Sequence, residues 1–75
     1  MRVEEVVADV FNLDPAELTD ASSKDTITEW DSMGHLSLIT TIEERFRISL
    51  ATADAMDMTS IAKIKDILKQ YGVPA

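Results

Sequence analysis

Three segments of this 75-residue chain carry apolar residues at helical spacing, and they constrain its fold most. Apolar side chains three and four positions apart lie on one side of a helix, where they can pack against a neighbour. The first segment predicts a helix over about residues 2–12, and its stripe consists of Val3, Val6, Val7, Val10 and Phe11. Valine has a low helix propensity, so packing must stabilise this helix.

The second segment begins at Asp31 or Ser32 and ends near Phe46. Its predicted core stripe consists of Met33, Leu36, Ile39, Ile42 and Phe46, with Leu38 widening it. The third segment follows a Thr59 or Ser60 cap. Its stripe consists of Ile61, Ile64, Ile67, Leu68 and Tyr71.

The connection between the first two helices is long. Asp14 followed by Pro15 is typical of a short capped helical turn. Residues 19–31 are mostly polar and predict a loop, which the apolar Ile27 and Trp30 would attach to the core.

The second connection predicts one more short element. Residues 47–50 are expected to be a loop and residues 52–57 a short helical turn, while Gly72 and Pro74 would end the last helix. We therefore predict one domain over residues 1–75. It is an all-α bundle of three main helices plus a short fourth helical element, with the long loop between the first and second main helices.

The composition excludes several classes of site. The chain has no cysteine and one histidine, so we expect no disulfide, no zinc–thiolate site and no other metal site. No apolar run reaches the roughly 20 residues of a membrane span, and no apolar signal segment is recognised. We expect a monomeric, stand-alone cytoplasmic protein that does not insert into membranes.

The charge is concentrated in one part of the chain. Residues 1–31 hold nine acids and two bases, a net charge of −7, whereas residues 32–47 and 48–75 are each neutral. Nucleic acid is excluded as a partner because phosphate binding needs clustered Lys and Arg. The acids could attract a basic protein surface, or they could simply keep a small protein soluble.

Ser32 stands between the polar loop and the second predicted helix. Taken alone it predicts a helix N-cap. A serine nucleophile needs a base, and the sole candidate is His35, with no evident third group to orient it. We therefore expect no catalytic residue and no enzyme. His35 is expected on the solvated surface, with a contact to a phosphate on Ser32 as the alternative.

The motif around Ser32 resembles a known family. Trp30-Asp31-Ser32-Met33-Gly34-His35-Leu36 is similar to the Asp-Ser-Leu signature of acyl and peptidyl carrier proteins. Ile42-Glu43-Glu44-Arg45-Phe46 matches the end of that family's second helix, and Thr59-Ser60-Ile61 matches the start of its last helix. The resemblance covers essentially the whole chain.

The resemblance implies that a phosphopantetheinyl transferase esterifies Ser32 with phosphopantetheine taken from coenzyme A. The terminal thiol of this arm would carry an acyl group as a thioester, making the chain a phosphoprotein of lipid biosynthesis. Asp31 matches an acid that contacts the transferase, and Met33 an apolar residue that docks in a partner. The absence of cysteine agrees, since the cofactor would supply the working thiol.

The resemblance also implies roles for residues further along the chain. Glu43, Glu44 and Met56 match positions that bind partners. The positions that line the family's acyl pocket are matched by Leu36, Leu38, Ile42, Leu50 and Met58, all of which the pattern alone would place in the core. A ligase that loads an acyl or aminoacyl group and a downstream synthase or transferase are the further implied partners.

Two positions depart from fatty-acid carriers. Gly34 and Met56 stand where those proteins often have acids. We interpret this as reduced charge on the partner-facing surface, which favours a dedicated lipid or secondary-metabolite pathway with few partners. An aminoacyl or peptidyl carrier of a nonribosomal-type pathway is the first alternative. The second is an unmodified helical interaction domain.

Overall fold

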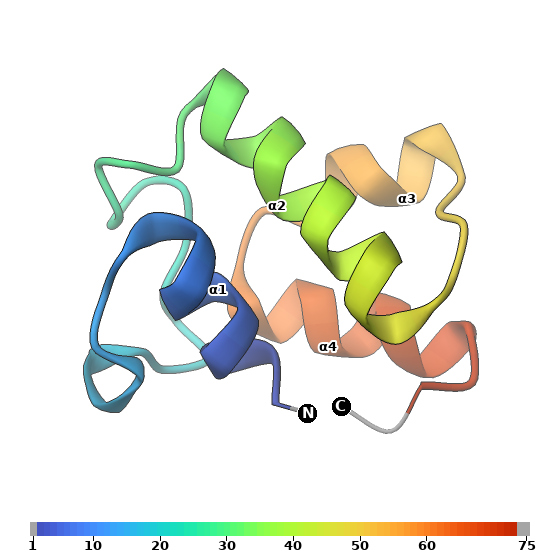
Figure 1. Cartoon of the computed structure of the whole chain (residues 1–75), viewed down its shortest axis with the longest axis horizontal. Coiled ribbons are helices and arrows are strands. Elements are labelled where there is room, and N and C mark those ends of the chain that lie inside the picture. Colours follow the sequence, from blue (N-terminus) through green and yellow to red (C-terminus); the bar gives the residue numbers. More distant parts are fainter. Residues whose placement is uncertain (1, 74–75) are drawn as a thin grey trace.

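Four helices and a 3-10 turn make up the computed structural model, which describes residues 2–73. In chain order these elements are α1 (Val3–Phe11), η1 (Pro15–Glu17), α2 (Ser32–Phe46), α3 (Thr52–Asp57) and α4 (Ile61–Gln70) (Figure 1). The predicted fold class is confirmed, with α3 as the short fourth element and the long loop between α1 and α2. Gly72, at φ 79°, follows α4 in a conformation that favours glycine. Pro74, the other predicted stop, lies outside the described residues.

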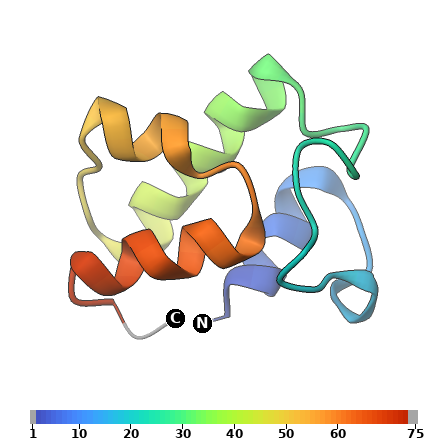
Figure 2. The same cartoon turned by 180° about the vertical axis from the view of Figure 1, so that it is seen from behind.

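The helices enclose one apolar core. α2 runs diagonally across the molecule above α1, and α3 is stacked over α4 on the side seen in Figure 2. All three main helices and the long loop supply buried side chains. The core consists of Val3, Val6, Val7, Phe11, Ile27, Trp30, Leu38, Ile42, Met58, Ile61, Ile64, Ile67 and Leu68. The helical stripes of α1 and α4 and the two loop residues are therefore buried as the sequence predicts, except that Val10 and Tyr71 are half-buried and pack against the core.

The predicted core stripe of α2 is wrong in its first two turns. Met33 and Leu36 are 79% and 68% exposed, whereas Leu38 and Ile42 are fully buried. The reason is that other residues meet the neighbouring elements there. Gly34 lies against Phe11 of α1, and His35 bonds to Trp30 and to α3. Met33 and Leu36 are left facing away from the core.

The long loop is fixed to the start of α4. The first amide groups of a helix lack partners within it. Here the Ile61 amide donates to the Ser22 carbonyl at 2.9 Å, and the Ala62 amide donates to the Asp20 carbonyl at 3.1 Å. The Ser60 hydroxyl accepts from the Lys63 amide, so Ser60 rather than Thr59 is the cap. These bonds, together with buried Ile27 and Trp30, explain how so polar a segment is ordered.

Candidate functional site

Ser32 is the first residue of α2, and its side chain is exposed. The hypothesis that it caps the helix is wrong. Asp31 is the N-cap, with an extended backbone and a carboxylate that accepts from the Gly34 amide at 2.8 Å. A carboxylate in that place also interacts favourably with the helix dipole. Within residues 2–73 no group hydrogen-bonds to the Ser32 hydroxyl, which is therefore accessible at a helix terminus that favours an attached anion.

His35 is half-buried and fully engaged, unlike the solvated residue expected from the sequence. Its Nδ1 lies 3.0 Å from Trp30 Nε1, and its Nε2 lies 2.7 Å from the carbonyl oxygen of Ala55 in α3. An indole nitrogen can only donate and a carbonyl can only accept. The ring is therefore held away from Ser32 by other partners, and a Ser–His catalytic pair is not formed.

A hollow of about 760 Å³ opens beside Ser32. The loop, α2 and α3 all contribute to it, and we call it the Ser32 hollow. Its lining consists of Lys24, Trp30, Asp31, Ser32, His35, Leu36, Thr52, Met56 and Thr59. Leu36 and Met56, the latter 70% exposed, supply apolar surface next to an attachment point that is itself polar. Such a mixture suits a flexible group of mixed polarity.

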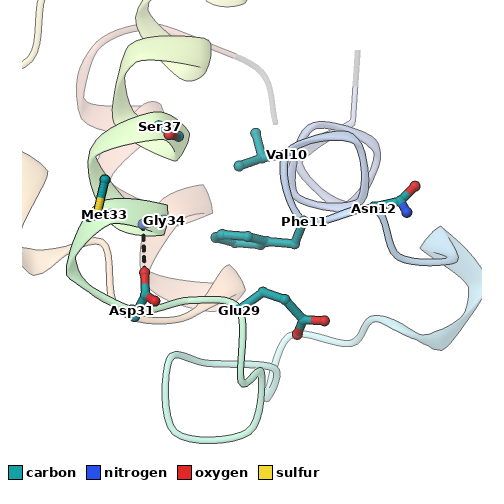
Figure 3. Close-up of a pocket in the computed structure, with 8 residues that line it drawn as sticks. All are labelled: Val10, Phe11, Asn12, Glu29, Asp31, Met33, Gly34 and Ser37. Carbon is teal, nitrogen blue, oxygen red and sulfur yellow. Dashed lines mark hydrogen bonds between the residues drawn. The ribbon is translucent and has the colours of Figure 1, made fainter.

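A smaller hollow, of about 310 Å³, lies between α1 and the start of α2. Figure 3 shows the Phe11 ring directed at the first turn of α2, with Glu29 and Asp31 at the rim. Gly34 makes this approach possible. A Cβ on Gly34 would collide with the Glu29 carbonyl oxygen and lie 2.8 Å from Phe11 Cε1. Glycine at this position therefore has a steric cause, and the reduced charge inferred from the sequence stays a prediction.

The structure separates the five residues assigned to an acyl pocket. Leu38, Ile42 and Met58 are fully buried in the core, and Leu50 is half-buried and packs against it. Leu36 is exposed and lines the Ser32 hollow. The interior positions are thus filled by their own side chains, and the open space lies at the surface.

The residues assigned to partner binding also differ from one another. Glu43 is half-buried, and its Oε2 accepts from the Leu50 amide at 2.8 Å, which orders the loop after α2. Glu44 and Met56 are exposed. Nearby, Arg45 forms an ion pair with Asp9 of α1 at 2.7 Å, so its charge is shared within the molecule.

Among the described residues, no group of three or more His, Cys, Asp or Glu side chains is arranged to hold a metal ion. No helix in this part of the chain is both long and apolar enough to cross a membrane.

Comparisons with known proteins agree with this geometry. No protein-family model matches the chain. It is 29% identical over 70 residues to a curated acyl carrier protein of Buchnera aphidicola subsp. Baizongia pistaciae, a match covering 93% of this chain and 90% of that protein. A solution NMR structure of holo acyl carrier protein from Geobacter metallireducens superposes with a TM-score of 0.79 and 25% identity, covering 91% of this chain and 78% of that one.

The resemblance to acyl carrier proteins is confirmed. Acyl carrier proteins are carriers and not enzymes, in line with the expectation that this chain does no chemistry itself. Two features of this chain were not found from its sequence. The Trp30–His35–Ala55 contact joins residues up to 25 positions apart in the chain, and no local pattern reports it. One feature of the sequence could have indicated the close approach of Phe11 to Gly34: a glycine lies inside a segment whose apolar pattern predicts a helix.

Proposed function

We propose that the chain is an acyl carrier protein whose Ser32 bears phosphopantetheine. The observation that supports this best is the exposed Ser32 hydroxyl, unpartnered within residues 2–73, at the start of α2. When bound, the group would supply a terminal thiol that holds an acyl group as a thioester. Ser32 would provide the ester oxygen, and the N-terminus of α2 would stabilise the phosphodiester.

The surroundings of Ser32 fit such an arm. The Ser32 hollow offers apolar Leu36 and Met56 to a chain attached at its edge. Exposed Met33 lies next to the serine and is available to a transferase or synthase. Asp31 keeps one carboxylate oxygen on the Gly34 amide, which fixes its position at the approach to Ser32.

Mass spectrometry tests the attachment. The unmodified chain is incubated with coenzyme A, magnesium and a broad-specificity phosphopantetheinyl transferase. We expect a gain of one phosphopantetheine in the wild type and in Ser37→Ala, and none in Ser32→Ala. Modification of Ser32→Ala, or no modification of the wild type, would contradict the proposal.

A second candidate, an aminoacyl or peptidyl carrier, is favoured by one observation. Leu38, Ile42 and Met58 have no exposed surface, so a cargo held outside the core needs no rearrangement. For the main proposal we infer a dedicated lipid or secondary-metabolite pathway. Exposed Met33 and Met56, rather than a strongly acidic α2, would supply the specific contacts.

Methionine methyl resonances distinguish the two carriers. Met33 and Met56 report on the surface and Met58 on the interior. Loading with a medium-length acyl chain should shift the Met58 methyl if the chain enters the core, and loading with an amino acid should not. Shifts confined to Met33 and Met56 with both cargoes would favour the aminoacyl carrier.

A further inference from the structure

His35 joins the loop, α2 and α3 through one ring. Trp30 Nε1–H donates to Nδ1 at 3.0 Å, so Nδ1 must carry a lone pair. The carbonyl oxygen of Ala55 lies 2.7 Å from Nε2, so Nε2 must carry the proton. Only one form of histidine satisfies both contacts: the neutral ring protonated on Nε2. We call this arrangement the Trp30–His35–Ala55 bridge.

The bridge matters because α3 is held by few contacts besides Met58, the fully buried residue that follows it. None of its six residues is buried. On the side of α4, the Tyr71 hydroxyl accepts from the Ala51 amide at 3.0 Å and donates to Asp54 Oδ2 at 2.6 Å. On the side of α2, the polar contact between α2 and α3 that the described residues show is the bond from His35 to the Ala55 carbonyl oxygen. An element without a buried side chain depends on such bonds for its position.

We propose that His35 is a positioning residue that holds α3 against α2 and thereby sets the width of the Ser32 hollow. Protonation of the ring releases α3 and widens the hollow. The significance of this hollow rests on the proposed carrier function, but the bridge and its response to pH belong to the unmodified chain.

The response to protonation follows from the donors and acceptors. An imidazolium carries N–H groups on both nitrogens, so its Nδ1–H would meet the Trp30 N–H and two donors would face each other. Trp30 is 3% exposed and packs on Phe11 with ring centroids 5.6 Å apart, so it cannot move aside. The His35 ring must therefore turn away from Trp30, and its bond to Ala55 is lost with the same motion.

Few charged groups surround this ring. Lys24 and Asp31 of the loop line the same hollow, and Asp54 and Asp57 lie on either side of Ala55 in α3. Histidine is the side-chain type that commonly changes charge between about pH 5 and 8.

One tryptophan and one histidine make the chain suitable for a direct test. Hydrogen exchange of the α3 amides, corrected for the intrinsic effect of pH, is measured on the unmodified chain at pH 7.5 and 5.5. Trp30 fluorescence is followed over the same range. In the wild type we expect α3 exchange to rise about tenfold on acidification, the equivalent of one or two lost hydrogen bonds. The fluorescence should change with the same midpoint.

Two variants separate positioning from a merely structural role. His35→Gln keeps one acceptor and one donor but does not titrate, so its α3 exchange should stay low and its fluorescence constant at both pH values. His35→Leu removes both bonds, so its α3 exchange should be high at both. A pH-independent α3 in the wild type would overturn the proposal, and so would a fluorescence change that leaves α3 exchange unaltered. Neither result depends on whether Ser32 accepts phosphopantetheine, which the mass measurement decides separately.

Discussion

Gly34→Ala tests whether close packing requires the glycine after Met33. The added Cβ would overlap the Glu29 carbonyl oxygen, with Phe11 Cε1 at 2.8 Å. Glu29 lies in a loop held by buried Ile27 and Trp30, so a shift of its backbone would cost free energy. Overpacking of this kind costs about 1–3 kcal/mol, against a gain in helix propensity of at most about 1 kcal/mol.

Because the overlap is with a backbone oxygen, the cost lies in the upper part of this range, and the expected result is a net loss of about 1–2 kcal/mol in the free energy of unfolding. With a urea m-value of about 1 kcal/mol/M, as for small proteins, the midpoint should fall by about 1–2 M. Urea unfolding followed by Trp30 fluorescence measures this. The matched control is Ser37→Ala, an exposed site one turn later in α2, which should stay within about 0.5 kcal/mol of the wild type. A Gly34→Ala protein as stable as the control would refute the steric argument.

Two further predictions concern stability. Asp31→Ala should lower the free energy of unfolding by about 1 kcal/mol because it removes the cap of α2, whereas Ser32→Ala should change it by less than about 0.5 kcal/mol. Urea unfolding measures both variants. A larger loss for Ser32→Ala than for Asp31→Ala would contradict the assigned cap. The hydrogen bond from Lys65 holds the pKa of Glu4 below its ordinary value of 4.5, so its stabilisation is present above that pH and is lost as the pH falls through the lower folded-state value. The melting temperature should therefore drop in acid less steeply for Glu4→Gln than for the wild type or for the exposed control Glu5→Gln, and equal slopes would contradict the assignment.

The helices could be predicted from the sequence because their spacing is local. Most of the α1 and α4 stripes is buried as the periodicity requires, and their remaining members, Val10 and Tyr71, pack against the core half-buried. At the start of α2 the same method failed for Met33 and Leu36, since spacing shows which residues share a face but not how far along the helix a neighbour reaches. The α2 cap was uncertain by one residue because Asp31 and Ser32 are both good capping residues.

The candidate site could be predicted only in part. The position of Ser32 at the start of α2 follows from the sequence, and so does the position of Met33 directly after it. The engagement of His35 does not, because its partner in α3 lies 20 positions away and is a backbone carbonyl with no residue-specific signal. The steric role of Gly34 likewise depends on Phe11, which a different helix supplies.

The contacts of Lys65 indicate the order in which parts of the molecule unfold. Its ammonium donates to Glu4 at 2.9 Å and to Asp20 at 2.7 Å, joining residues 61 and 45 positions away in the sequence. These contacts form only when α1, the loop and α4 have all docked, so they report on global folding. α3 is attached by bonds that close much shorter stretches of chain, such as the 17 positions between Asp54 and Tyr71. Partial opening should therefore begin at α3, and the remaining helices can stay assembled while the region beside Ser32 fluctuates.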